Sequence, residues 1–170
     1  MSRPAVSELL FEAPGAAGRR QLILLVFRVI LAAVFIYAAL QKIDKPLMFA
    51  DEIEMYGIIG HGPILYLAAI ILPWIEILCG LALLTGIFMR GSALILSAMN
   101  IVFIIVIAYR TVGIMSAEGT PFREVYFDCG CGFGATYAWK KLIEDAVFVV
   151  FSVYILFSPS YRFVIGRKKG

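Results

Sequence analysis

Apolar positions gather in four long runs along the chain. The runs cover residues 22–40, 63–84, 87–109 and 142–157, and Trp139 stands at the start of the fourth. A helix needs about 20 mainly apolar residues to cross a bilayer, and a helix satisfies its own backbone groups there. The pattern predicts an all-α, polytopic membrane protein, a bundle of four transmembrane helices over about 22–40, 63–84, 87–109 and 139–157.

A shorter amphipathic segment separates the first two runs. Pro46 suits a first helical turn, and Phe49, Ile53 and Tyr56 follow at helical spacing on one face. This pattern predicts an interfacial helix lying on the outer leaflet. Its acidic residues are expected to face water, as a solvated surface or as a docking surface for a soluble partner: Asp51, Glu52 and Glu54.

Composition agrees with a membrane protein. Hydrophobic residues make up 62% of the chain and charged residues 16%, the mean hydropathy is +0.92, and soluble domains have roughly 45–50% apolar residues. We expect a cytoplasmic segment over residues 1–20, one membrane domain over 21–158 and a basic cytoplasmic tail over 159–170. Arg19 and Arg20 precede a run that is long for a signal peptide and lacks a clear cleavage site, so a retained helix is expected. A net charge of +3 is too small to indicate nucleic acid as a partner.

Lys and Arg residues predict the orientation. With four spans both termini lie on one side, and that side carries eight of these residues against six on the other. This excess, the basic tail and the acidic character of the first and third loops favour cytoplasmic termini in a bacterial inner membrane. The cysteine loop, residues 110–138, is then periplasmic, in a compartment where disulfides persist.

Ionisable and polar residues inside the spans are costly and need partners. Arg28 and Glu76 both fall roughly 20 Å below the outer ends of their antiparallel helices, so we expect them to pair, either to set the helix register or for function. Asn100 is expected to form a hydrogen bond across the bundle. Glu144 and Asp145 lie near the outer end of the fourth span, close in depth to the cysteine loop. Either could act on a thiol proton, but at most one of them can face the bundle, and a solvated or capping carboxylate is the favoured interpretation.

The reactive chemistry is concentrated at Cys129 and Cys131, one residue apart in a glycine-rich loop. A disulfide across one residue departs from relaxed geometry and is more easily reduced. Gly130 and Gly132 permit the backbone angles that such a ring demands. The spacing favours reversible thiol-disulfide exchange over a permanent staple, which would remove little entropy from so small a loop.

Two other interpretations of the pair stay open. Cys129 and Cys131 are also compatible with an unreactive structural disulfide. Metal binding, with His61 as a third ligand, is the weakest interpretation because the chain has one histidine and no second cysteine pair.

Several motifs together resemble a known family. In order, these motifs resemble the DoxX-like superfamily, specifically its MauE branch, over about residues 22–157. The resemblance implies a four-helix inner-membrane protein of periplasmic redox maturation, often working with a thioredoxin-like protein, as in methylamine dehydrogenase assembly. Gly132 departs from the family, which has Phe directly after the second cysteine. The motifs are Ala39-Leu40-Gln41-Lys42-Ile43-Asp44-Lys45-Pro46, Phe49-Ala50, Tyr56, Leu72-Pro73-Trp74-Ile75-Glu76, Gly80, Leu83-Leu84-Thr85-Gly86 and Asp128-Cys129-Gly130-Cys131.

Three functions are therefore considered. The first is thiol-disulfide exchange with a thioredoxin-like partner by Cys129, Cys131 and Asp128, with a quinone near the loop suggested by architecture alone. The second is a non-catalytic accessory subunit or assembly factor of a larger membrane complex. The third is a small transporter or metal handler that uses Arg28, Glu76 and His61. Residues expected to face or support the partner are Lys42, Asp51, Glu52, Glu144 and Asp145.

Overall fold

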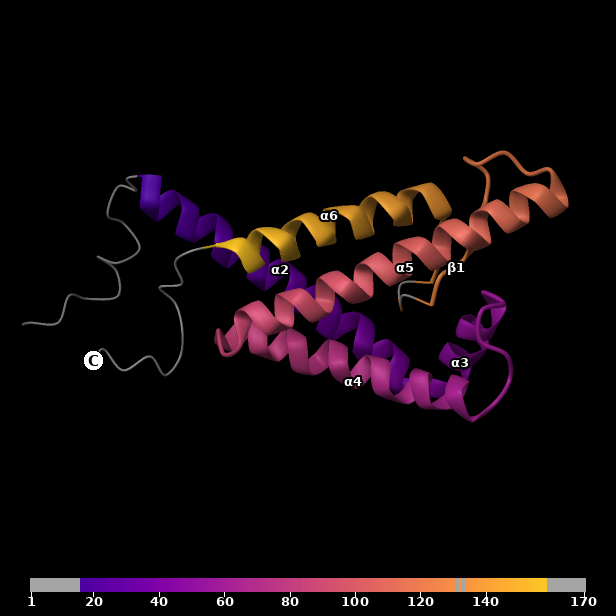
Figure 1. Cartoon of the computed structure of the whole chain (residues 1–170), viewed down its shortest axis with the longest axis horizontal. Coiled ribbons are helices and arrows are strands. Elements are labelled where there is room, and N and C mark those ends of the chain that lie inside the picture. The colour runs from indigo at the N-terminus through magenta and orange to yellow at the C-terminus, as the bar shows by residue number, and fades with distance from the viewer. Residues whose placement is uncertain (1–15, 131, 133, 159–170) are drawn as a thin grey trace, which may run out of the picture.

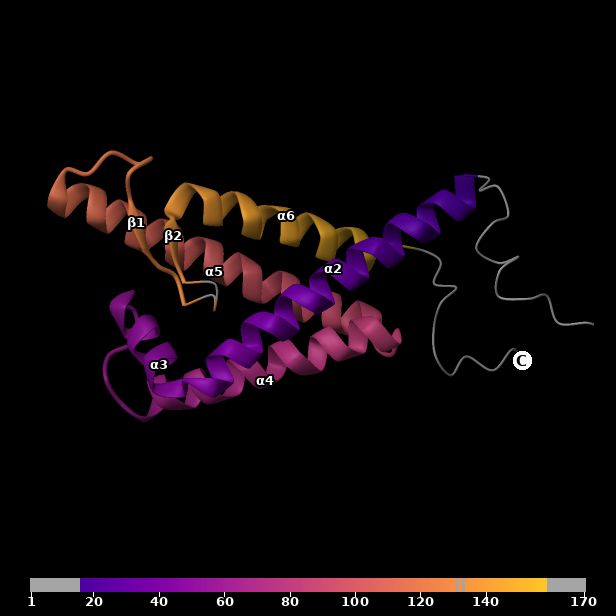
Figure 2. The same ribbon diagram turned by 180° about the vertical axis from the view of Figure 1, so that it is seen from behind.

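The computed structural model of the chain describes residues 16–130, 132 and 134–158. Four long helices run side by side, with α3 and a two-stranded hairpin at one end (Figures 1 and 2). The start of α2, the α4–α5 turn and the end of α6 lie at the opposite end. The elements are α2 (Ala16–Asp44), α3 (Pro46–Met55), α4 (Pro63–Thr85), α5 (Met89–Glu118), β1 (Tyr126–Asp128), β2 (Ala135–Tyr137) and α6 (Ala138–Phe157).

The helices pack mainly in two pairs, α2 with α4 and α5 with α6. Gly80 brings the first pair close together, because a Cβ there would lie 2.7 Å from Ile36 Cγ1 and 3.3 Å from Ala32 O. Small residues allow such close backbone approach between membrane helices. This contact sets the register of α4 along α2.

An apolar core fills the half of the bundle away from the hairpin. Leu31, Phe35, Leu83, Leu96 and Ile155 are buried there with their neighbours. Many large apolar side chains on the outward faces of the same helices remain exposed. An apolar outer surface over an apolar core is the pattern of helices surrounded by lipid.

Among the residues that the structure describes, three helices are long and apolar enough to cross a membrane. They lie at Gly18–Asp44, Pro63–Thr85 and Met89–Glu118. The fourth long helix, α6, has 20 residues and carries four charged residues in its first half: Lys140, Lys141, Glu144 and Asp145.

The third connection contains more regular structure than its composition indicates. α5 continues past Tyr109 to Glu118 and ends at Gly119, whose φ of 67° is left-handed. Arg, Met and Glu are good helix formers, so the helix persists where the apolar run ends. β1 and β2 then pair antiparallel, with Phe127 opposite Thr136, and β2 leads directly into α6.

Candidate functional site

The cysteine segment is the turn of the β1–β2 hairpin. Cys129 follows β1 directly. The N–H of Gly130 donates to Asp128 Oδ1 at 3.1 Å, an Asx-type turn that bends the chain at this point. Gly130 has a φ of 68° and Gly132 a φ of 78°, which a side chain would strain.

At both glycines the hairpin lies close against the helices. A Cβ on Gly130 would lie 2.8 Å from Glu52 Oε2 of α3, and a Cβ on Gly132 would lie 2.9 Å from Ala38 O of α2. Gly134 has a similar φ of 77° but nothing within 4 Å. Glycine at 132 is therefore required by space as well as by backbone angle, whereas at 130 the nearest atom is the end of the flexible Glu52 side chain and the backbone angle is the main requirement.

Cys129 is held inside this packing. It is 2% exposed and disulfide-bonded, while Cys131 lies outside the described residues. The Tyr56 hydroxyl donates to Cys129 O at 2.7 Å, and Cys129 and Tyr56 share a buried cluster with Ile107 of α5. Burial is the main cause that raises the pKa of Tyr56, and the nearby Glu52 adds to it, so the phenol stays a hydrogen-bond donor. Cys79 is a separate, free cysteine of the apolar core.

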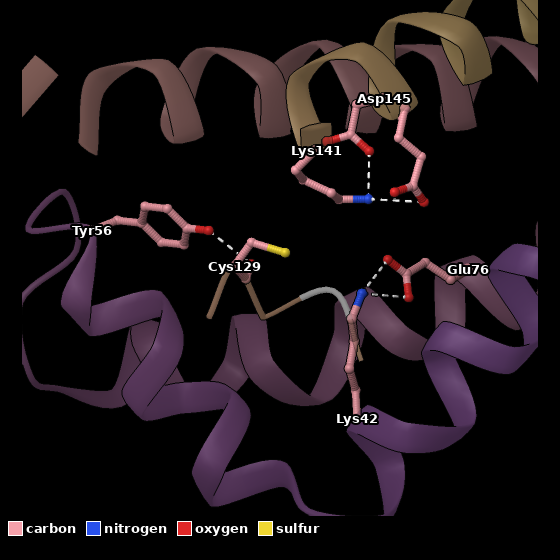
Figure 3. A network of polar contacts seen from close by, with 7 residues as sticks. Lys42, Tyr56, Glu76, Cys129, Lys141 and Asp145 are labelled. Atoms are coloured by element: carbon pink, nitrogen blue, oxygen red, sulfur yellow. Dashed lines mark hydrogen bonds and ion pairs between the residues drawn. The ribbon is translucent and has the colours of Figure 1, made fainter. Parts of the chain in front are cut away.

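Two ion pairs flank the direction in which the Cys129 side chain points in Figure 3. Lys42 Nζ of α2 bonds both oxygens of Glu76 of α4, at 2.6 and 2.9 Å, and these side chains are 4% and 1% exposed. Lys141 Nζ lies 2.7 Å from Asp145 Oδ1, one turn further along α6. The Cys129 sulfur points into the space between the two pairs.

A cavity of about 30 Å³ lies among the same residues. Its lining comes from α2, α4, α5 and α6, with Lys42, Glu76, Asn100, Lys141 and Asp145 as the polar members. Asn100 Nδ2 and Asp145 Oδ2 are buried there and have no hydrogen-bond partner among the described residues. The four long helices thus converge on one cavity, whose lining combines these polar side chains with apolar ones.

The expected Arg28–Glu76 pair is wrong. Arg28 Nε and Nη2 donate to Leu83 O at 2.9 and 2.8 Å. Gly80 of α4 lies against Ile36 of α2. Arg28 precedes Ile36 by about two helical turns, so in this antiparallel pair it meets the C-terminal end of α4. The last carbonyls of a helix lack intrahelical partners and attract cations.

The other predicted residues differ in how deeply they are buried. Asp145 faces the bundle at 2% exposed, and Glu144, whose side chain is 43% exposed, reaches Lys141 only at 3.5 Å. This confirms that at most one of the two faces inward. Asp51 is exposed on α3. Glu52 is half-buried, and burial and the neighbouring Asp128 raise its pKa.

Lys141 is the site residue that sequence reasoning missed. Its spacing to Asp145 is i,i+4, which places the two on one helix face. This spacing, at the start of an apolar run, is the sequence feature that indicates a buried ion pair. The sequence pattern puts Tyr56 on one face of an interfacial helix with Phe49 and Ile53, but its bond to Cys129 O joins segments 73 positions apart and has no local signal.

His61 lies in the α3–α4 connection with partners of its own. Its Nδ1 is 3.0 Å from Glu54 Oε2, and its Nε2 is 2.8 Å from the Tyr66 hydroxyl. The hydrogen bond and charge of Glu54 raise the pKa of His61. Among the described residues, no three His, Cys, Asp or Glu side chains are grouped to hold a metal ion.

An apolar pocket of about 370 Å³ lies between α3, α4 and α5. Its walls are Ala, Ile, Leu, Val, Met and Phe side chains and Tyr56, and the Tyr56 hydroxyl already donates to Cys129 O. The pocket suits a hydrocarbon chain and offers no free donor to the carbonyl oxygens of a quinone. A quinone cofactor stays a prediction, and no step is derived through it.

Membrane-length apolar helices that enclose charged pairs beneath a cysteine hairpin define a multi-pass membrane protein. The chain belongs to the family of the methylamine utilisation protein MauE, whose family model matches residues 20–158. The match includes both strands and the long helices, with α2 covered from residue 20 onward. No curated protein and no solved structure matches the chain, and the wider DoxX-like placement stays a prediction.

Proposed function

We propose that this chain carries out thiol-disulfide exchange in redox maturation at a membrane surface, with Cys129 and Cys131 as the exchanging pair. The observation that carries the proposal is a disulfide-bonded Cys129 in a hairpin turn docked on α2 and α3. Membership of the MauE family indicates methylamine utilisation as the pathway. A thioredoxin-like protein of the periplasm is the proposed partner.

The proposed topology has four spans, with α6 as the fourth and α3 lying at the interface. The charges of α6 argue for this placement, because Lys141 and Asp145 pair inside the bundle. Intramembrane charges are tolerated when they face the interior and satisfy one another. Both termini are then cytoplasmic, and the hairpin faces the periplasm of a bacterial inner membrane.

The two cysteines have different proposed roles. The sulfur of Cys129 is inaccessible to a soluble partner because the residue is 2% exposed. A partner thiolate therefore attacks the Cys131 sulfur, a mixed disulfide forms there, and the electron pair of the broken bond stays on Cys129. The second thiol of the partner then attacks the mixed disulfide, releasing an oxidised partner and a reduced pair. Asp128 supports the turn through its bond to the N–H of Gly130.

The proposed contact surface for the partner is a groove of about 140 Å³ beside the hairpin. Lys42, Glu52, Asp128, Gly132 and Gly134 are among its lining residues. It joins the turn to the ends of α2 and α3, where Asp51 adds an exposed carboxylate. The groove combines charged and backbone groups, which suits a polar, transient contact.

The test is to trap the partner in the host with single cysteine variants. Cys129→Ser leaves the attacked sulfur without its internal competitor, so we expect a mixed disulfide between Cys131 and a thioredoxin-like protein. Cys131→Ser should trap much less, and Cys79→Ala should behave as the unmodified protein because Cys79 lies in the apolar core. Equal trapping by both loop variants would contradict the assignment of roles.

The second candidate function is an accessory subunit or assembly factor with a structural disulfide. The tight burial of Cys129 favours it, since buried disulfides are poorly accessible to reductants. It predicts that Cys129→Ser keeps full pathway activity and unchanged partner content. Loss of activity without loss of the folded protein would reject it.

A further inference from the structure

More charged residues are buried beneath the hairpin than are needed to fix the positions of the helices relative to one another. Lys42, Glu76, Lys141 and Asp145 are each at most 6% exposed, and they form two separate ion pairs. Buried ion pairs are weak sources of stability because desolvation offsets their attraction. One such pair would be enough to set a register. Both pairs nevertheless line one cavity, and the Cys129 sulfur points into the space between them (Figure 3).

The network is balanced in charge while the disulfide is intact. Two ammonium groups face two carboxylates, and Lys42 interacts electrostatically with Asp145 across the cavity. A thiolate on Cys129 would add one negative charge at a buried position, since the residue is 2% exposed. Such a charge is costly unless a proton or a cation neutralises it.

Asp145 has the atom at which a proton can bind. Its Oδ1 is engaged by Lys141, but its Oδ2 is buried without a partner among the described residues. Asn100 Nδ2, a donor, is unpartnered at the same cavity. About 30 Å³ of space is the volume of one water molecule, which can accept from Asn100 and donate to Asp145.

We propose that this cavity is a proton-uptake site coupled to the disulfide, with Asp145 as the proton acceptor and Lys141 as the cation for the Cys129 thiolate. The proposal rests on the exchange reaction proposed above. When a thiolate attacks Cys131, the sulfur–sulfur bond breaks and its electron pair stays on Cys129. One proton from solvent binds Asp145 Oδ2, and the Lys141 ammonium, freed from a neutral carboxyl, pairs with the thiolate. Re-formation of the disulfide releases the proton.

The other charged groups around Asp145 fit this assignment. Lys42 stays bound to both oxygens of Glu76, so that pair is satisfied in either state. Glu144 is more exposed than Asp145 and lies 3.5 Å from Lys141. Glu52 of α3 and Asp128 of β1 add negative charge that acts on Tyr56. These carboxylates make an unneutralised thiolate on the neighbouring Cys129 still more costly.

The test is the equilibrium between the purified protein and a dithiothreitol redox buffer, quantified by thiol mass tagging at several pH values. In the unmodified protein the reduced form takes up two protons, as dithiothreitol does, so the equilibrium constant should not change between mildly acidic and neutral pH. Asp145→Asn cannot take up its proton. Its reduced form should therefore be favoured by about tenfold for each unit of rising pH.

Lys140→Met is the matched control, because Lys140 is the exposed neighbour of Lys141. It should keep the pH-independent equilibrium. The double variant Lys141→Met/Asp145→Leu removes both charges and should also be pH-independent, since its Cys129 can only become a neutral thiol. A pH-independent equilibrium in folded Asp145→Asn would overturn the proposal.

A measurement on the unmodified protein covers the case in which Asp145→Asn does not fold. The reduced-minus-oxidised infrared difference spectrum should show a new band of a protonated carboxyl group. A spectrum without that band would reject Asp145 as the acceptor. Because neither readout uses the partner, failure to trap a mixed disulfide in the host would refute the exchange function while leaving the proton-uptake result intact.

Discussion

Buried charged side chains have different partners at the two ends of the bundle. At the end away from the hairpin, Arg28 is a buried charged residue in a mainly apolar region. It donates to Leu83 O and Leu84 O, which are helix-end carbonyls in need of donors. These bonds join α2 to the C-terminal end of α4.

At the hairpin end the same helices enclose full charges of both signs. Lys42 and Glu76 link α2 to α4, while Lys141 and Asp145 pair within α6 and therefore join no two helices. A pair within one helix adds nothing to how helices are arranged. The apolar end is held by packing and by hydrogen bonds to helix-end carbonyls, whereas the hairpin end keeps buried charges that this packing does not require.

The largest expected effect comes from leaving one charge of the hairpin end unpaired. Glu76→Leu should lower the free energy of unfolding by about 3–5 kcal/mol, because the Lys42 ammonium stays buried without a counter-charge. The double variant Lys42→Met/Glu76→Leu should recover most of that loss. Arg28→Met at the apolar end should cost less, since it removes the charge itself. Unfolding in detergent measures the stability of all three variants. If Glu76→Leu and Lys42→Met/Glu76→Leu were equally stable, the difference between the two ends of the bundle would not hold.

The next effect separates space from backbone angle in the hairpin turn. Gly132→Ala should weaken docking of the hairpin by about 1–3 kcal/mol, because it combines a left-handed φ with a clash at Ala38 O. Gly134→Ala carries a similar φ but meets nothing within 4 Å, so it should cost only the strain. Hydrogen exchange of the hairpin amides measures the difference. Identical exchange in the two variants would show that α2 does not hold the turn.

A smaller effect is expected from the hydrogen bond that holds Cys129. Tyr56→Phe removes the donor to Cys129 O and should weaken this end by about 1 kcal/mol. The rate at which dithiothreitol reduces the disulfide should rise correspondingly. Tyr66→Phe, which loses only a contact to exposed His61, is the control and should leave the rate unchanged. A rise in both variants would point to general loosening instead.

The smallest effect lies outside both ends, in the α3–α4 connection. Glu54→Gln should lower the pKa of His61 toward its ordinary value, because the carboxylate holds the imidazolium. A raised pKa in the folded state means that the contact stabilises the protein below the ordinary pKa of histidine and is lost as the pH rises through the folded-state pKa. His61 is the one histidine of the chain, so its titration can be followed directly by NMR. An unshifted titration would show that the pair does not form in solution.

Elements with a strong local pattern were predictable. The apolar run at 63–84 became α4 at Pro63–Thr85, and the amphipathic segment from Pro46 became α3. The strands were missed because three residues each are too few to show alternation. Helix ends outside the apolar runs were also missed, since polar residues prolonged α5 to Glu118. Of the site, the cysteine pair and its glycines could be found from spacing alone.

The sequence by itself determined that this chain is built from membrane-length helices and that two neighbouring cysteines lie in a glycine-rich segment, because both properties depend on residues close together along the chain. Only the tertiary structure decided which charges meet. Glu76 pairs with Lys42 and not with Arg28 because the close contact at Gly80 sets how far α4 slides along α2. Such a register depends on packing between distant segments, and ion pairing follows it because Coulomb attraction between buried groups requires contact distances.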